Sequence, residues 1–244
     1  MFAGKKVIMF DLDGTLVDSV GVWNEVDRLV IRKIGGTEPE ETEIQKQRDS
    51  VMRRNSKAEH PYLEYCRYLK DVYNPSCTAE EVLKLRYDIA DDYLANTIDY
   101  KPGAEKVLHS LKAHGFVMAV ATATRRKNLD IYLTVNRNIM GKAKLDECFS
   151  IIYSQEDTKE IKPNPEVYLR IMRELDAAPS ECLIFEDSLV GVEAAHHAGI
   201  QAVAMYDKYS DGEREEINAL AEYRFNSYDE VLAAIEAEFE HRLN

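Results

Sequence analysis

The chain has 244 residues, of which 45% are hydrophobic and 31% charged, a composition typical of a globular protein with a sizeable core. Its formal net charge of -13 argues against nucleic acid or an anionic membrane as a partner, because both would repel an acidic surface. No apolar segment is long enough for a membrane span or a signal peptide, and the four scattered cysteines form no Cys-x-x-Cys pair, so we expect a cytoplasmic protein with reduced thiols.

The first expected element is a buried strand over residues 7–10, which is followed by Asp11 and Asp13. Side chains two positions apart on a strand point the same way, so these carboxylates would form one concentrated negative site. Such a site repels itself unless it shares a cation or a proton. Aspartate is also a common turn or helix-cap residue after a strand, and a lone Asp-x-Asp-Gly would favour that interpretation.

Residues 19–98 are predicted to form four helices and no strand. Apolar residues at helical spacing follow Ser19 and Pro61, and residues 78–81 have the pattern of a capping box before the fourth helix. The second helix, over residues 40–54, is polar with few apolar anchors, so we expect it to pack weakly on the surface.

From Lys101 onward, helices are predicted to alternate with apolar strands, and an amphipathic helix is expected over residues 229–243. The expected strands cover residues 116–124, 150–153, 182–185 and 201–205. This alternation predicts the α/β class, with a doubly wound, Rossmann-like parallel sheet and helices on both faces. We therefore expect a core domain of residues 1–18 and 99–244 and an inserted, all-helical cap domain of residues 19–98. Residues 136–147 suggest no role.

Residues with phosphate or metal chemistry stand where several expected strands end: Thr122, Lys162 shortly after its strand, and Glu186 with Asp187. Ligands bind beyond the carboxyl ends of strands in sheets of this kind. Each residue also has an ordinary interpretation. A Thr suits a strand, a Lys before Pro is usually a solvated charge, and acidic residues suit a helix N-terminus.

Four motifs together resemble the haloacid dehalogenase superfamily. The string Asp11-Leu12-Asp13-Gly14-Thr15-Leu16-Val17-Asp18-Ser19 is similar to its first motif, in which the first Asp is the nucleophile. Thr122, the Lys162-Pro163-Asn164-Pro165 string and Glu186-Asp187 resemble the second, third and fourth motifs, in the family's order. The helical insertion is similar to the subgroup that contains phosphoglycolate phosphatase and β-phosphoglucomutase.

This resemblance implies that Asp11 attacks phosphorus and that Asp13 is the general acid and base. It implies that Thr122, or Thr124 if the register differs by two, binds a phosphoryl oxygen together with Lys162. Mg²⁺ would be held by Asp11, Asp187 and the backbone carbonyl of Asp13, with Glu186 in or beside the ligand set. Asp13 favours phosphoryl transfer over dehalogenation, because a dehalogenase has no leaving alcohol to protonate.

The function that these residues favour is a Mg²⁺-dependent phosphatase acting on a small phosphorylated metabolite. A mutase of the β-phosphoglucomutase kind is less favoured, because such mutases carry a cap histidine where this chain has Trp23. A purely binding protein would not need an acid/base beside a nucleophile. Trp23, Arg53 and Arg54 are candidates for substrate specificity, although cap packing and a solvated basic surface also explain them. Both a monomer and a homodimer remain open.

Overall fold

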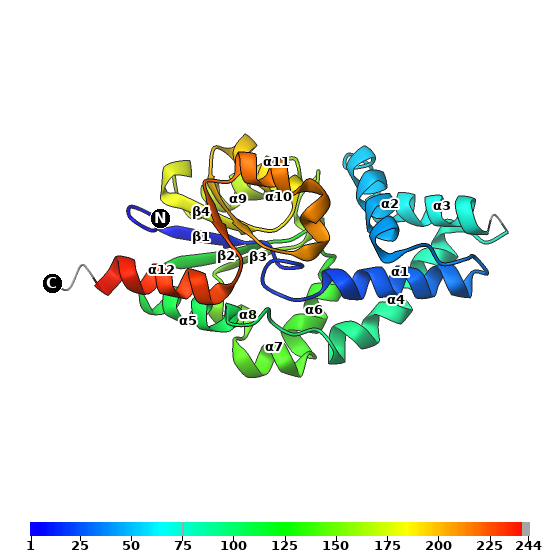
Figure 1. The fold of residues 1–244 in the computed structure, drawn as a ribbon, viewed down its shortest axis with the longest axis horizontal. Helices are drawn as coiled ribbons and strands as arrows, with labels where there is room; N and C mark the ends of the chain where they lie inside the picture. The colour runs from blue at the N-terminus through cyan, green and yellow to red at the C-terminus, as the bar shows by residue number, and fades with distance from the viewer. Residues whose placement is uncertain (75, 241–244) are drawn as a thin grey trace.

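Six strands form one parallel sheet in the order β3-β2-β1-β4-β5-β6 in the computed structural model, which describes residues 1–74 and 76–240 (Figure 1). The predicted α/β class and parallel sheet are confirmed. The strands are β1 Val7–Phe10, β2 Val117–Ala121, β3 Ile151–Tyr153, β4 Cys182–Glu186, β5 Gln201–Met205 and β6 Tyr223–Phe225. The sequence did not predict β6, because its three residues include a central Arg224 and make no apolar run.

Helices cover both faces of the sheet (Figure 1). Alternate residues of β1 point to opposite sides, so that Ile8 and Phe10 join one apolar core while Val7 and Met9 join the other. The first core packs against α5 (Ala104–Ala113) and α12 (Tyr228–Glu240), and the second against α9 (Glu166–Glu174), α10 (Leu189–Ala198) and α11 (Arg214–Leu220). Short 3₁₀ helices at Gln155–Asp157, Pro179–Glu181 and Lys208–Glu213 lie between these elements.

Four helices, α1 to α4, leave the sheet after β1 and lie at one end of the molecule (Figure 1). Their bounds are Val20–Lys33, Glu41–Arg54, Pro61–Tyr73 and Ala79–Asn96, which confirms the four predicted helices. The predicted capping box of α4 is present, since Thr78 Oγ1 accepts from Glu81 N at 3.1 Å and Glu81 Oε2 accepts from Thr78 N at 2.8 Å. The prediction that α2 packs weakly was wrong, because Ile44, Arg48 and Val51 are all buried.

Residues 136–147, for which the sequence suggested no role, bind the end of α4, after which the chain returns from these helices to the sheet. These residues cover α7 (Arg137–Lys142) and all but the last residue of α8 (Leu145–Cys148), which follow α6 (Arg126–Thr134). Asn136 Oδ1 accepts from Ile139 N at 2.9 Å and caps α7, while its amide donates to the carbonyls of Leu94 at 2.7 Å and Ile98 at 2.9 Å. One side chain therefore fixes the end of α4 to the start of α7.

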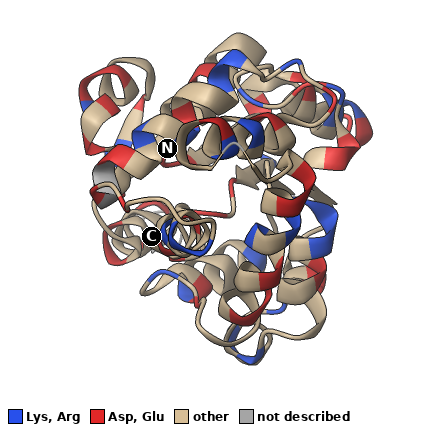
Figure 2. Cartoon of the chain, turned by 90° about the vertical axis from the view of Figure 1, so that its right-hand side faces the viewer, with Lys and Arg blue, Asp and Glu red and all other residues tan. Residues whose placement is uncertain are grey.

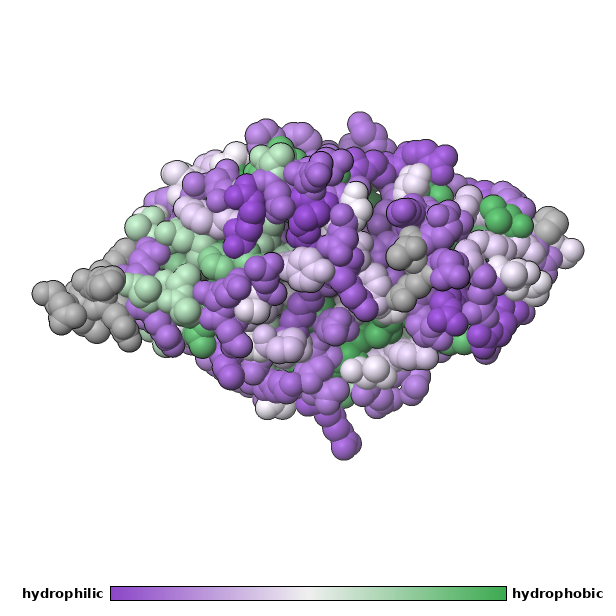
Figure 3. Space-filling model, viewed as in Figure 1, coloured by the Kyte–Doolittle hydropathy of each residue, from purple (hydrophilic) through white to green (hydrophobic). Residues whose placement is uncertain are grey.

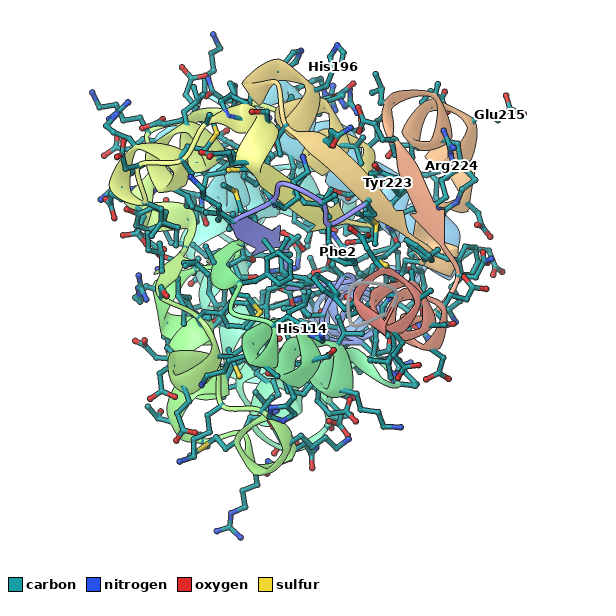
Figure 4. The ribbon with its side chains drawn as sticks, turned by 90° about the vertical axis from the view of Figure 1, so that its left-hand side faces the viewer. Phe2, His114, His196, Glu215, Tyr223 and Arg224 are labelled. Carbon is teal, nitrogen blue, oxygen red and sulfur yellow. The ribbon has the colours of Figure 1, made fainter. Side chains whose placement is uncertain are left out.

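The N-terminus and α12 pack together at the end of the sheet far from α1 to α4 (Figure 1). The Phe239 ring lies 6.4 Å from that of Phe2 and 4.2 Å from that of His114, centroid to centroid, and both partners are labelled in Figure 4. The face in Figure 3 is largely hydrophilic, and its apolar residues show near this end and in smaller patches elsewhere. Residues 241–243 of the predicted last helix lie outside the described residues, and no described helix is both long and apolar enough to cross a membrane.

Candidate active site

The carboxyl ends of three adjacent strands bring Asp11, Thr122 and Asp187 to one cavity of about 210 Å³. Asp11 follows β1, Thr122 follows β2, and Asp187 follows β4. Residues of α1, α2, α3 and α4 line the same cavity from the opposite side. Seen from the side of these helices, acidic and basic residues are interspersed over the chain (Figure 2).

Lys162 lies at the centre of the site with a side chain that is only 6% exposed. Its ammonium donates to Asp11 Oδ1 at 2.7 Å, to the Ala121 carbonyl at 2.8 Å and to Glu186 Oε1. Burial opposes the charged ammonium, but the carboxylates of Asp11 and Glu186 outweigh it and raise the pKa of Lys162 well above its ordinary value. The ammonium is therefore a fixed positive charge beside Asp11.

Carboxylate oxygens of Asp11, Glu186 and Asp187 lie within 4.8 Å of one another. Burial raises the pKa of Asp187 to about 7, and the charges of Glu186 and Asp207 add to this effect. Burial also raises the pKa of Asp11 well above its ordinary value, against the opposing effect of Lys162. One ammonium does not balance three buried carboxylates, so the cluster has the character of a cation site.

The oxygen atoms of this cluster fit a hard divalent cation. Both carboxylate oxygens of Glu186 already accept hydrogen bonds, Oε1 from Lys162 and from Tyr168 at 2.8 Å, and Oε2 from Ser188 at 3.2 Å. Among the described residues, Oδ2 of Asp11 and Oδ2 of Asp187 accept none, while Asp187 Oδ1 accepts from Thr15 Oγ1 at 2.7 Å. The two aspartates are thus the better ligands, and Glu186 orients Lys162.

The side chain of Asp13 lies outside this cluster and is held by three hydroxyl groups. Its Oδ1 accepts from Ser19 Oγ at 2.5 Å and from the Tyr132 hydroxyl at 3.1 Å, and its Oδ2 accepts from Thr124 Oγ1. The carboxylate is therefore oriented independently of the metal ligands. Metal binding through its backbone carbonyl stays a prediction.

Sequence reasoning assigned no role to the Ser19 and Tyr132 hydroxyls. Ser19 closes the first motif, which is a signal that could have drawn attention to it. Tyr132 had no such signal, because a buried aromatic residue in the middle of a helix usually only packs.

Thr122 and Thr124 both line the cavity, and Thr122 directly follows the last residue of β2. Thr122 Oγ1 accepts a hydrogen bond from Thr124 N at 3.1 Å. Its own O–H donates to no other described residue, and Thr122 lines the same cavity as Asp11. Thr122 is thus positioned to donate to a phosphoryl oxygen, while Thr124 orients Asp13.

The three specificity candidates have different surroundings. Trp23 lines the cavity, as does Arg53, whose guanidinium pairs with Glu193 at 3.4 Å and Glu213 at 3.5 Å across to the sheet side. Arg54 does not line it, because its Nε donates to the Ser50 carbonyl on an exposed part of α2. Two arginines that the sequence did not single out, Arg48 and Arg86, also line the cavity.

Comparison with known proteins connects this geometry to one family. A model of the haloacid dehalogenase-like hydrolase family matches residues 8–205. The phosphorylated carbohydrates phosphatase of Thermotoga maritima is 26% identical over 198 residues, which cover 81% of this chain and 83% of that protein. The bifunctional riboflavin kinase/FMN phosphatase of Arabidopsis thaliana is 27% identical over 198 residues, 81% of this chain, and the chain spans 48% of that longer protein.

A solved structure with a similar fold covers both the sheet and the helical insertion. The crystal structure of CbbY from Rhodobacter sphaeroides in complex with phosphate matches with a TM-score of 0.74 and 22% identity. The match covers 92% of this chain and 95% of that one. At this identity the similarity shows the shared fold alone.

Proposed function

The chain belongs to the haloacid dehalogenase-like hydrolase family and is an enzyme of its phosphatase class, and we propose that it is Mg²⁺-dependent and hydrolyses a small phosphorylated metabolite through a phosphoryl group on Asp11. The observation that carries this proposal is the convergence on one cavity of two aspartates with different surroundings. Asp11 lies 2.7 Å from the Lys162 ammonium within the carboxylate cluster, whereas Asp13 is held apart by hydroxyls. One aspartate is thus arranged for attack and the other for proton transfer.

In the first half-reaction, a carboxylate oxygen of Asp11 attacks the phosphorus atom of the substrate. The new bond joins Asp11 to phosphorus, and the bond between phosphorus and the alcohol oxygen breaks. Asp13 gives its proton to that oxygen, so the product leaves as a neutral alcohol. The Lys162 ammonium and the Thr122 hydroxyl stabilise charge on the phosphoryl oxygens, which is where most of the catalysis of phosphoryl transfer lies.

In the second half-reaction, water attacks the same phosphorus atom and the bond to Asp11 breaks. Asp13 takes the proton of the attacking water, which returns both aspartates to their starting states. Phosphate is the product, and no group other than water is consumed. The hydroxyls of Thr124, Ser19 and Tyr132 hold Asp13 in place for both proton transfers.

Asp11 and Asp187 would hold the metal ion, with Lys162 and Glu186 beside them. When bound, a divalent ion lowers the repulsion between the Asp11 carboxylate and the phosphate dianion. The choice of Mg²⁺ is supported by the all-oxygen donor set and by the small number of carboxylates that remain available.

The cavity does not favour a mutase. The described residues that line it include no histidine, and Trp23 lies on the cap side where a mutase of the β-phosphoglucomutase kind carries one. The Trp23 indole has no basic nitrogen, so it has no means of transferring a proton to or from a sugar hydroxyl. Hydrolysis is the reaction that the lining residues support.

Phosphate release from a panel of sugar phosphates, phosphoglycolate and nucleotides tests this proposal, with and without Mg²⁺. We expect metal-dependent release by the wild type and none by Asp11→Asn, whose folding is checked by circular dichroism. Isomerisation of a sugar phosphate without release would favour the mutase. Near wild-type release by Asp11→Asn would refute the mechanism.

A further inference from the structure

The cavity wall opposite the nucleophile contains a buried arginine that neither the sequence motifs nor the mechanism uses. Arg86, on α4, is 2% exposed, and its Nε donates to Asp27 Oδ1 at 2.6 Å. The guanidinium carbon lies 4.5 Å from the ring centroid of Trp23 and 5.3 Å from that of Tyr62. The aromatic faces and Asp27 together fix the plane of the guanidinium.

The other edge of this guanidinium has no partner in the part of the chain that the structure describes. Neither Nη atom of Arg86 donates a hydrogen bond there, although Arg86 lines the same cavity as Asp11 and Lys162. A guanidinium presents its donors in a rigid fork that matches a carboxylate or a phosphate. Neither Nη atom is enclosed, so this edge of the guanidinium is open to the cavity, where an anionic group of a ligand can replace water.

The charges around Arg86 leave positive charge available. Arg48 lies beside it, with Nη1 donating to Asp27 Oδ2 at 2.9 Å and Nη2 to Asn24 Oδ1 at 2.9 Å. Two guanidinium groups therefore share the one buried carboxylate of Asp27. Asp49 also lines the cavity and lies 3.9 Å from Arg48 Nε, and burial raises its pKa, but no ion pair joins it to Arg86 among the described residues.

The cavity thus has the carboxylate cluster on the sheet side and a guanidinium with an open Nη edge on the cap side. We propose that the Nη edge of Arg86 binds a second anionic group, a carboxylate or a phosphate, on the ester that the enzyme cleaves. The inference rests on the proposed phosphatase function and narrows its substrate class to esters with two anionic groups. Trp23 takes part by fixing the guanidinium plane rather than by contacting the reacting phosphate.

Matched esters test this proposal. Phosphoglycolate and its longer homologues carry a carboxylate, the bisphosphates of short diols carry a second phosphate, and the alkyl phosphates of equal length carry neither. The variant is Arg86→Lys, which keeps a cation beside Asp27 but loses the fork. Its matched control is Arg67→Lys, at an exposed cap arginine that pairs with Glu64. Thermal melts establish that both variants fold.

We expect the wild type to prefer one of the dianionic series over the alkyl phosphates by about tenfold or more in kcat/KM, the size of a charge-assisted hydrogen-bond pair. Arg86→Lys should lose roughly that factor for the preferred series while changing the alkyl phosphates less than about threefold. Arg67→Lys should behave like the wild type. Which series the wild type prefers shows whether the group that Arg86 binds is a carboxylate or a phosphate.

Binding to the Asp11→Asn protein, measured by the thermal shift each ester produces, separates this inference from the proposed function. The inference holds if the dianionic esters bind more tightly than the alkyl phosphates of equal length only when Arg86 is present. If, in addition, the wild type hydrolyses no ester, only the proposed function fails. Equal binding of both kinds of ester, or equal losses for both in Arg86→Lys, would overturn the inference.

Discussion

Replacing Lys162 by Met should destabilise the protein strongly, and more so at higher pH. The substitution removes an ammonium that is 6% exposed and that contacts the carboxylates of Asp11 and Glu186. Breaking a buried ion pair costs about 3–5 kcal/mol, because the remaining charge is left without a partner. For a chain of this size, 1 kcal/mol corresponds to about 2–4 °C in melting temperature, so we expect a decrease of roughly 6–20 °C.

The pH dependence follows from the direction of the pKa shifts. Burial raises the pKa of Asp11 well above its ordinary value and that of Asp187 to about 7, so the folded protein retains protons that the unfolded chain has released. A folded state that binds more protons than the unfolded chain loses stability as the pH rises from the ordinary carboxyl pKa to the raised one. Lys162 lowers the pKa of Asp11 and so opposes the effect of burial. Its removal should therefore reduce the free energy of unfolding most at about pH 8 and least at about pH 5.

Urea and thermal unfolding of the metal-free protein at both pH values measure this effect. Lys144→Met is a matched control, since Lys144 pairs with Glu147 on the surface with side chains 47% and 62% exposed, and such pairs contribute about 0.2–1 kcal/mol. If Lys162→Met cost no more than Lys144→Met, or cost more at the lower pH, the assignment of Lys162 as the counter-charge of the cluster would be refuted.

Three further predictions concern the surroundings of the site. Because the pKa of Asp187 is raised to about 7, chiefly by burial, Mg²⁺ should raise the melting temperature more at about pH 8 than at about pH 6, and equal shifts would contradict this. Tyr132→Phe removes one hydroxyl that orients the acid/base and should lower kcat about tenfold with little change in KM; an unchanged kcat would argue against that role. In Gly191→Ala the added carbon would lie 2.0 Å from the Glu186 side chain, so we expect urea unfolding to show a loss of about 1–3 kcal/mol in the free energy of unfolding. In the control Gly141→Ala the added carbon meets nothing within 4 Å, and this free energy should not fall.

Much of the core could be predicted because its signals are local. An apolar run of strand length that ends in Asp11 marks both a buried strand and the edge at which its ligands gather. The alternation of helices and strands then places Thr122 and Asp187 at the same edge, as the sheet order shows. The family that these motifs suggested is the one that the chain belongs to.

The cap could not be predicted in the same way, because its polar contacts join residues far apart in the chain. Arg86 and Asp27 are separated by 59 positions, and each resembles an ordinary charge on an amphipathic helix. Arg48 occurs in a helix whose polar composition suggested weak packing, yet it is buried because Asp27 and Asn24 satisfy it. The role of Asn136 likewise depends on carbonyls some forty residues earlier in the chain.

The central claim is that a phosphoryl group passes through Asp11, and the Asp13→Asn variant tests it most directly. With p-nitrophenyl phosphate the leaving group needs no general acid, so the first half-reaction should proceed while the second stops for lack of a base. We predict one burst of p-nitrophenol per enzyme and, after an acid quench, a phosphoryl group on the peptide that contains Asp11. Steady release without a burst, or a phosphoryl group on another residue, would contradict the mechanism.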